Sequence, residues 1–314
     1  MNSELNNRNS EIIRTLVLTT ILALFGMYYF PFIMFLYPVM FIVLGVRHGA
    51  RYSLMGLLAS ASLLGLIVDI ISGILMFIAF MPLTLIIINS IVRRRKATKT
   101  LLYSTIAFLV SVIMIVSFVN MNGVSVIGQL KGNITQIVNS QMDLLGQLNL
   151  TKEQVAEIRN LQGSYLEIVL AVIPSVIIIF SLVISYLNYL ISSLLLRNKE
   201  YAVVFIPSFS NFELPKNIFL GLGIMFLTTF LLHNFNLINS FEVILNLIVL
   251  TIFVFFVQGI SVIDHKLKEK RIKIGWRVFL IILILDFIPI IGLLAILLGL
   301  FDVIFDFRKL RSSN

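Results

Sequence analysis

The sequence predicts an all-α fold: a polytopic transmembrane helical bundle of about 8 to 10 membrane segments, with a short amphipathic helical outer loop. Long apolar runs, such as Leu101 to Val119 and Ile218 to Leu232, recur along the chain. Hydrophobic residues make up 59% of the chain and charged residues 12%, whereas soluble domains are about half apolar and about a quarter charged. Lys and Arg gather between the apolar runs, as the positive-inside rule requires. Helices are favoured because an open sheet cannot satisfy its backbone in lipid.

The first eight spans follow directly from the apolar runs. They are predicted at residues 13–30, 32–46, 52–69, 74–92, 101–119, 165–195, 217–233 and 241–262. The first run ends in Tyr28-Tyr29-Phe30-Pro31 rather than at a small-residue cleavage site, so we expect a retained span and not a signal peptide. The polar residues 1–10 before it are expected to be disordered or interfacial.

The C-terminal apolar stretch has two interpretations. A single span over 276–300 would place Arg308, Lys309 and Arg311 on the outer side, against the positive-inside rule. Pro289 disfavours a continuous helix and, with Gly292, can divide the stretch into two short segments, 276–288 and 291–305. We prefer this hairpin, although both segments are short for a bilayer.

Loop charges set the expected orientation. Basic clusters lie at Arg47–Arg51, Arg93–Lys99, Arg197–Lys199 and His265–Lys273. In the path above all four fall on one side, which we expect to be cytoplasmic. The protein is therefore expected in the cell membrane, with a cytoplasmic N-terminus and, if the hairpin forms, a cytoplasmic C-terminus.

Three regions follow from the pattern of polarity. Residues 1–119 form an N-terminal membrane bundle of about five spans, 120–164 an extracytoplasmic loop, and 165–314 a C-terminal membrane bundle with a cytoplasmic tail. The loop contains Thr151 and Gln154 at capping-box spacing before a short helical pattern. Apolar residues between Ile127 and Val138 suggest a second amphipathic helix. The loop is either a connector on the bilayer surface or a lid over a ligand site.

Several function classes find no support in the residues. The net charge is +9, but the basic residues lie at the ends of spans, so we expect no nucleic-acid partner. The chain has no cysteine, and its three histidines are far apart, so no metal site is expected. Motifs of metalloproteases, serine hydrolases and phosphate-binding loops are absent from the sequence. We expect no enzyme and no cofactor.

Ionisable groups within or near spans are the first candidates for ligand binding, because a charge in the bilayer is costly. Ser62, Gly65, Asp69 and Ser72 share one helix face if that helix extends far enough. Asp69 then either contacts a ligand or caps the next helix. Asp286, three residues before Pro289, either contacts a cation or amine or pairs with a nearby donor. Our ligand-binding candidates are Asp69, Asp286, Ser62 and Gly65.

Candidate residues for docking a protein partner lie in the loops that we expect to be cytoplasmic. The stretch Tyr201 to Lys216 is more apolar than a solvated connector requires, so it either lies in the membrane interface or docks a partner. The Arg93 to Lys99 cluster and the tail from Asp302 to Arg311 are the other candidate surfaces. The individual docking candidates are Arg93, Arg94, Arg95, Phe205, Phe209, Phe212, Asp306 and Arg308.

Short motifs along the chain carry a family resemblance. They are Gly45-Val46-Arg47-His48-Gly49, the small residues from Gly56 to Gly65, Leu298 to Asp302, and Asp306-Phe307-Arg308-Lys309. With these motifs the chain resembles the YybS-like family of bacterial integral membrane proteins. That family is similar, in its N-terminal half, to the substrate-binding components of energy-coupling-factor transporters, which capture vitamins or metal ions and depend on separate ATPases. The resemblance implies an outer solute site and a cytoplasmic surface for a coupling partner.

Two functions therefore remain open. The first is a solute-binding or transport component, whose partners are the lipid bilayer, a small-molecule solute and a cytoplasmic or membrane coupling protein. The second is a non-transporting scaffold or regulator of a membrane signalling or cell-envelope protein. This second function is implied by the family too, since its members are often encoded beside a membrane-bound cyclic-dinucleotide phosphodiesterase.

Overall fold

A computed structural model describes residues 2–123, 125–145, 166–198, 201, 208–235 and 240–308. All regular elements in these ranges are helices, which confirms the predicted all-α fold. The chain packs as two units. Unit 1 contains residues 1–148 and 177–206, and unit 2 contains residues 149–176 and 207–314.

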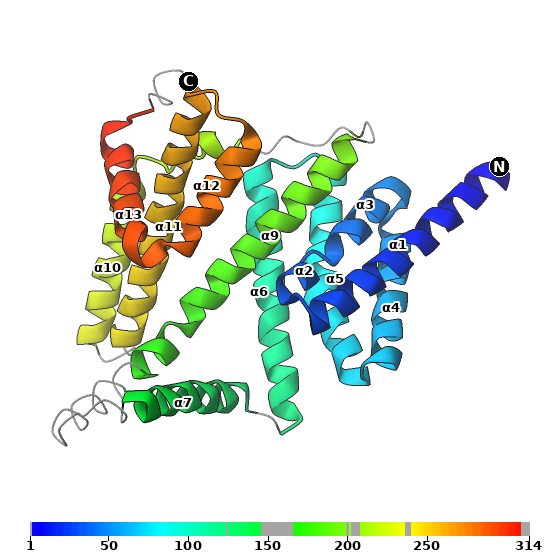
Figure 1. Cartoon of the computed structure of the whole chain (residues 1–314), viewed down its shortest axis with the longest axis horizontal. Coiled ribbons are helices and arrows are strands. Elements are labelled where there is room, and N and C mark those ends of the chain that lie inside the picture. Colours follow the sequence, from blue (N-terminus) through cyan, green and yellow to red (C-terminus); the bar gives the residue numbers. More distant parts are fainter. Residues whose placement is uncertain are drawn as a thin grey trace. The chain divides into compact units, whose positions relative to one another are not determined.

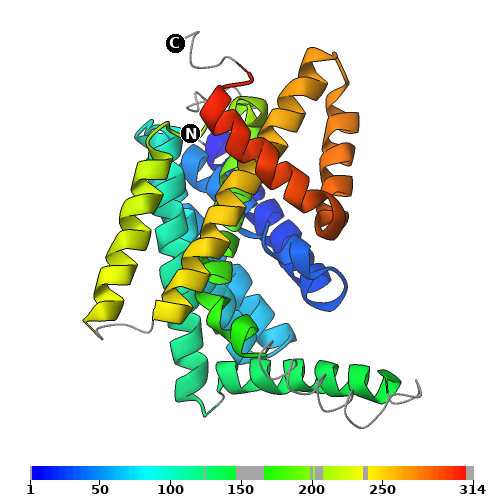
Figure 2. The ribbon, with the colours of Figure 1, turned by 90° about the vertical axis from the view of Figure 1, so that its left-hand side faces the viewer.

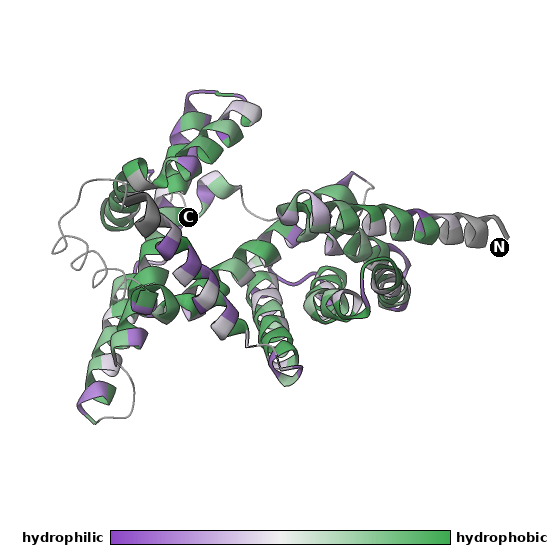
Figure 3. Cartoon of the chain, turned by 60° about the horizontal axis from the view of Figure 1, so that its bottom comes forward, coloured by the Kyte–Doolittle hydropathy of each residue, from purple (hydrophilic) through white to green (hydrophobic). Residues whose placement is uncertain are grey.

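Seven helical segments are long and apolar enough to cross a membrane, or up to eight if a bent helix pair near the C-terminus counts as one span. Apolar residues cover most of the length of the helices (Figure 3). The seven segments are Ser10–Tyr28, Pro31–His48, Ala50–Ile67, Ile70–Val92, Ala97–Met121, Ile173–Arg197 and Phe241–Glu269. Each corresponds to one predicted span, and the shorter apolar helix α10 (Ile218–Asn234) corresponds to the remaining one.

The C-terminal apolar stretch is not one straight span. Helices α12 (Ile274–Asp286) and α13 (Ile288–Phe305) meet at Phe287, and the bend between them is 113°. Pro289 occupies the first turn of α13, where its missing N–H leaves no helical bond unmade. The break thus falls beside Pro289, as the sequence predicts, and the geometry fits either a broken span or a re-entrant pair.

Unit 1 begins with α1 (Asn2–Tyr28), which already includes residues 2–10. Residues 2–10 are therefore helical rather than disordered, and the alternative, that they lie at the membrane interface, stays a prediction. The second span consists of two helices, α2 (Pro31–Met34) and α3 (Pro38–His48), each with a proline in its first turn. Residues 35–37 form a turn between them, so this span is discontinuous.

The other helices of unit 1 are α4 (Ala50–Ile67), α5 (Ile70–Val92), α6 (Ala97–Met121), α7 (Val126–Leu145) and most of α9 (Ile173–Arg197). Figure 1 shows these elements along the chain. α7 confirms the amphipathic helix predicted around Ile127 to Val138. The predicted capping box at Thr151 and Gln154 lies outside the described residues.

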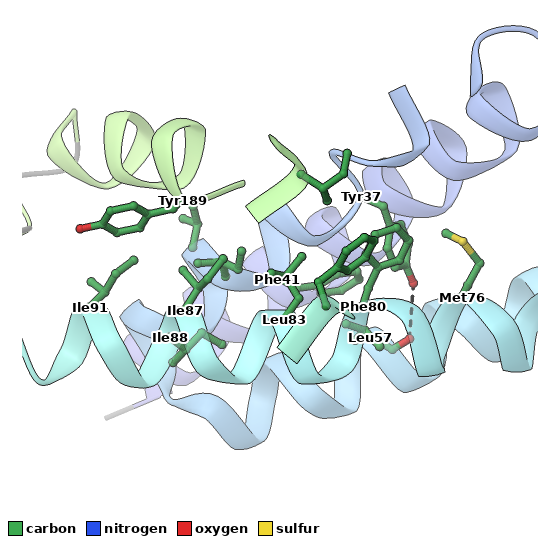
Figure 4. Close-up of a cluster of buried hydrophobic side chains, with 14 of the residues drawn as sticks. Tyr37, Phe41, Leu57, Met76, Phe80, Leu83, Ile87, Ile88, Ile91 and Tyr189 are labelled. Carbon is green, nitrogen blue, oxygen red and sulfur yellow. Dashed lines mark hydrogen bonds between the residues drawn. The ribbon is translucent and has the colours of Figure 1, made fainter. Parts of the chain in front are cut away.

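The core of unit 1 is aromatic at its centre. The ring of Tyr37 lies 5.2 Å from that of Phe41 and 5.7 Å from that of Phe80, and Phe80 stacks on Phe108 at 6.0 Å. Figure 4 shows Tyr37, Phe41 and Phe80 gathered beside Leu57 and Leu83. All five side chains are almost fully buried. Because lipid is as apolar as these residues, close packing rather than water exclusion must hold the helices together.

α9 joins this core although more than 50 residues separate it from α6 along the chain. The ring of Phe180 lies 4.8 Å from that of Phe35 and 6.2 Å from that of Phe108. By packing, therefore, residues 177–206 belong with the N-terminal helices. The division predicted from polarity, with boundaries at 119 and 164, places them instead in the C-terminal bundle.

Unit 2 is organised around α11 (Ser240–Glu269) and α13. Figure 2 shows α13 lying across α11. Glycines bring the two backbones together: a Cβ atom at Gly259 would overlap the carbonyl oxygen of Ala295, and one at Gly299 would overlap that of Phe255. Small residues allow this close approach of membrane helices. The 3₁₀ turn η1 (Phe209–Asn211) also packs against α11.

Candidate functional site

Asp69 caps helix α5. Its side chain accepts hydrogen bonds from the backbone N–H of Ser72 at 2.8 Å and from the Ser72 hydroxyl at 2.5 Å. The hydroxyl bond first, and the backbone bond next, lower the pKa of Asp69 below its ordinary value. This is the capping role that the sequence left open beside a ligand contact. A ligand contact by the same exposed carboxylate stays a prediction.

Ser62 and Gly65 are on α4, whereas Asp69 and Ser72 are not. α4 ends at Ile67, and the extended backbone of Asp69 starts a new helix. The expectation that the four residues share one helix face is therefore wrong. Gly65 instead lies where α4 and α5 come close together: a Cβ atom at Gly73 of α5 would lie 2.9 Å from the Gly65 Cα atom, so the close contact requires glycine at position 73. Ser62 is exposed.

Asp286 is the last residue of α12, and its side chain is exposed. It lies in unit 2, whereas Asp69 lies in unit 1. A ligand-binding role for Asp286 stays a prediction.

The arginines of the first docking candidate end helix α5. Arg93 is its C-cap residue, and Arg94 has a φ of 50°, in the left-handed region. The N–H groups of Arg94 and Arg95 then donate to the carbonyls of Ile91 and Ser90, which closes the helix end. The Arg95 guanidinium lies 5.2 Å from the centre of the Tyr103 ring. Arg93 and Arg94 are exposed.

Four of the other docking candidates lie close together in unit 2: Phe209, Phe212, Asp306 and Arg308. The Arg308 side chain is 1% exposed, and it links the loop containing Phe209 and Phe212 to helices α11 and α13. We call this group of Arg308, Asp302, Gln258, Ser261 and the loop carbonyls of Ser210 and Phe212 the Arg308 network. The sequence predicted the loop and the tail as two candidate surfaces for docking a partner, but it did not predict that they bind each other. Phe205 lies outside the described residues.

Every N–H of the Arg308 guanidinium has an acceptor. Nη1 donates to the Ser210 carbonyl at 3.0 Å and to the Ser261 hydroxyl oxygen at 2.8 Å. Nη2 donates to the Phe212 carbonyl at 2.8 Å and to Asp302 Oδ2 at 2.9 Å. Nε donates to the same Oδ2 atom at 3.2 Å. These five hydrogen bonds to four acceptor atoms use the full donor capacity of an arginine side chain, as a buried guanidinium requires.

Gln258 and Ser261 on α11 complete the Arg308 network. Gln258 donates to Asp302 Oδ2 at 2.7 Å and accepts from the backbone N–H of Leu214 at 3.1 Å. The Ser261 hydroxyl lies within hydrogen-bonding distance of the carbonyls of Phe209 and Phe212. Three donors thus converge on Asp302 Oδ2, while Oδ1 of the same carboxylate has no partner among the described residues. Asp306 follows in the left-handed region, and its N–H donates to the Asp302 carbonyl.

A second charge pair lies further along α11. Arg277 of α12 donates to both carboxylate oxygens of Asp264, with Nη2 at 2.6 Å from each. The two side chains are 14% and 6% exposed. α11 therefore carries two buried polar contacts, one toward α13 and one toward α12. Among the described residues, no group of three or more His, Asp or Glu side chains could hold a metal ion.

Unit 1 contains a different polar feature, a row of small polar side chains on α9. Ser181, Ser185, Asn188 and Ser192 recur at helical spacing, and none of them is exposed. We call these four residues the α9 polar row. The hydroxyls of Ser181 and Ser185 and the Oδ1 atom of Asn188 have no hydrogen-bond partner in the part of the chain that the structure describes.

The α9 polar row faces the discontinuous second span. Asn188 Nδ2 donates to the carbonyl of Phe35 at 2.8 Å, in the turn between α2 and α3, and also to that of Ile184 at 2.9 Å. Ser192 donates to the carbonyl of Val39 at 3.4 Å. Broken helices tolerate irregular backbone inside a membrane protein where such groups satisfy it, and they often line binding sites in transporters.

Comparison with known protein families assigns the chain to one family. Residues 17–303 match the family described as "Predicted membrane protein (DUF2232)", which is most of the chain. The chain belongs to this family. No curated protein and no solved structure matches it. This DUF2232 protein is therefore a multi-pass integral membrane protein in contact with the lipid bilayer.

Sequence reasoning missed several residues of these clusters. The spacing of Ser181, Ser185, Asn188 and Ser192 was a usable signal, because polar residues at a period of 3.6 in an apolar helix mark a face that avoids lipid. Gln258, Ser261 and Asp264 on α11 give a similar signal. By contrast, Asp302 and Arg308 are six residues apart across a helix end, so no periodic pattern indicated their pairing.

Proposed function

We propose that this DUF2232 protein is a solute-binding or transport component that relies on a separate energy-coupling partner. The observation that carries the proposal is the α9 polar row against the discontinuous second span of unit 1. In an apolar bundle, an unpartnered buried polar atom is costly unless water or a ligand satisfies it. Three such atoms on one helix face suit a small polar solute with donor groups.

The same row explains how the site would be positioned. Asn188 fixes the turn between α2 and α3 through the Phe35 carbonyl, while its own Oδ1 remains able to accept a hydrogen bond. A solute that donates to this oxygen would be held beside a helix break. Phe35, whose carbonyl accepts this bond, also packs its ring edge to face against Phe180 of the same helix α9.

The coupling partner is proposed from the sequence. The chain has no phosphate-binding loop of its own, so movement of a solute would need energy from another protein. Its resemblance to the substrate-binding components of energy-coupling-factor transporters agrees with this division of labour. The basic clusters would then mark the cytoplasmic side, with both termini on it. We propose no catalytic role.

The test is to identify small molecules retained by the full-length protein. The wild type and the variants Asn188→Leu and Ser185→Ala would be purified from native membranes in mild detergent, and bound compounds measured by mass spectrometry. We expect a compound that is enriched on the wild type and reduced at least tenfold on Asn188→Leu. The control is Ser117→Ala, at an exposed position of α6. A compound retained equally by all variants, or none at all, would count against the α9 polar row as its site.

One observation favours a second function, a non-transporting scaffold or regulator. The Arg308 network fixes the loop residues 208–214 and the end of α13 to α11, so unit 2 presents this surface in one defined arrangement. Phe212 and Phe307 are more than a third exposed there. A membrane signalling enzyme that co-purifies with the wild type, but not with Phe212→Ser, would support this function. Association that is unchanged in Phe212→Ser and in Arg308→Met would exclude this surface as the contact.

A further inference from the structure

A groove lies at the basic end of α11 in unit 2. Its volume is about 530 Å³, within the range of about 300 to 1,000 Å³ that is typical of ligand pockets. Five apolar side chains and two lysines line it: Val262, Ile263, Leu267, Leu298, Phe307, Lys266 and Lys270. We call it the lysine groove. It is distinct from the α9 polar row, which belongs to unit 1.

The lining of the lysine groove changes from apolar residues to lysines along α11, in the same order as a bilayer changes from hydrocarbon to headgroups. Val262 lies in the apolar part of α11, which is a membrane-spanning segment. Lys266 lies about one turn further along α11, and Lys270 follows directly after its last residue, Glu269. The two lysines are four residues apart, so they share a helix face with each other. The groove therefore leads from the depth of the hydrocarbon to that of the lipid headgroups.

The charge around the groove favours an anion. Residues 265–273 contain five Lys and Arg side chains and one acidic residue, Glu269. Glu269 pairs with Lys266 at 2.9 Å, but in the described part of the chain no ion pair occupies Lys270. The C-terminal end of a helix carries partial negative charge. At the end of α11, backbone N–H groups satisfy two of these carbonyls. The N–H of Arg271, whose φ is 56°, donates to the Lys268 carbonyl, and that of Ile272 donates to the Leu267 carbonyl.

We propose that the lysine groove binds an anionic phospholipid, with an acyl chain against Leu298 and Phe307 and the phosphate between Lys266 and Lys270. Apolar walls and a basic rim at the end of a span are the features by which membrane proteins bind anionic lipid headgroups. A soluble anion would gain nothing from five apolar side chains, whereas a zwitterionic lipid would gain less from the two lysines.

The test is to compare lipid retention by full-length variants. Protein in neutral detergent would be titrated with phosphatidylglycerol or phosphatidylcholine, and bound lipid counted by native mass spectrometry. We expect the wild type to bind one molecule of phosphatidylglycerol in preference to phosphatidylcholine. The affinity for phosphatidylglycerol should be about 30-fold weaker in Lys266→Gln/Lys270→Gln. The control is Lys268→Gln/Lys273→Gln, which removes the same charge from the same cluster outside the groove. We expect the control to change affinity less than about threefold.

A second pair of variants tests the acyl chain separately from the charge. Leu298→Trp should fill the groove and reduce phosphatidylglycerol binding, whereas Leu297→Trp, at the neighbouring exposed position, should not. Size-exclusion profiles that match the wild type would show that each variant is folded. Equal losses in both double-lysine variants, binding unaffected by Leu298→Trp, or equally strong competition by glycerol phosphate would each overturn the proposal. Glycerol phosphate lacks an acyl chain, so it distinguishes a lipid from a free phosphate compound.

Discussion

The two units of this DUF2232 protein use different means to hold helices together. Unit 1 relies on close packing of side chains. Its centre is aromatic, with small buried hydroxyl residues on the helices around it; the rings are those of Tyr37, Phe41, Phe80 and Phe108. Unit 2 has a small apolar core. It relies on the buried Arg308–Asp302 pair and the partly buried Arg277–Asp264 pair, together with glycine contacts between α11 and α13. We infer that the stability of unit 1 depends mainly on the packed volume of its buried side chains. That of unit 2 depends mainly on the pairing of its buried charges.

The contrast has a physical basis in the lengths of the helices. Unit 1 contains six of the seven full-length spans, wholly or in large part, so many side chains share its core. Unit 2 has one full-length span, a shorter helix and the bent pair α12–α13. Short helices offer less packing area and more helix ends, whose carbonyls need donors. Arg308 supplies donors to two carbonyls of the adjoining loop.

The strongest test of the contrast is Arg308→Met. It leaves the Asp302 carboxylate buried without its cation, which we expect to lower the stability of unit 2 by about 3 to 5 kcal/mol. The double variant Arg308→Met/Asp302→Asn should recover part of this loss. Denaturant titration of the purified protein measures both. Arg93→Met, at an exposed helix end, is the control, with an expected change below about 0.5 kcal/mol. A double variant no more stable than Arg308→Met would contradict charge compensation.

In unit 1 the corresponding test removes the volume of a buried side chain. Phe80→Ala deletes a ring that contacts Tyr37 and Phe108, and the cavity should cost roughly 3 to 5 kcal/mol. Phe32→Ala, at a position that is 74% exposed, should cost much less. The same titration gives both values. If the two variants were equally stable, the aromatic centre would not be what holds unit 1 together.

The glycine contacts should show an intermediate effect. Gly299→Ala places a methyl group against the Phe255 carbonyl, and we expect a loss of about 1 to 3 kcal/mol as α11 and α13 separate. Gly221→Ala on α10, where a Cβ atom would meet nothing within 4 Å, should be neutral or slightly stabilising. A thermal unfolding assay in detergent can compare them. Equal melting temperatures would mean that the close backbone contact contributes little.

The smallest expected effect is that of the Asp69 cap. Since Ser72 lowers the pKa of Asp69 below 3.8, its carboxylate stabilises the helix fully above that pH, and the contribution is lost as pH falls through the lowered pKa. Asp69→Ala should lower the melting temperature at pH 7, whereas Asp69→Asn should retain most of the cap. As the pH falls through this lowered pKa, the difference in melting temperature between wild type and Asp69→Asn should narrow. Identical melting curves for all three proteins would show that the cap does not matter.

The positions of the spans were determined by the sequence, since hydropathy and helical periodicity are properties of neighbouring residues. Pro289 indicated a chain break for the same reason, because a proline acts on its own turn of helix, whereas the break before Pro38 within the predicted span 32–46 was not predicted. The capping role of Asp69 was also among the local options. Family membership agrees with this level of information, since the matched family is itself defined as a membrane protein.

Only the tertiary structure decided which distant residues meet. Asn188 contacts Phe35 across 153 positions, and Arg308 contacts Ser210 across 98. The sequence gives no account of such pairs, because they depend on how helices pack and on where each helix ends. The shift of α9 into unit 1 has the same cause. In a membrane every span is apolar, so it is the few buried polar contacts and the close approach of small residues that select one arrangement of helices over others.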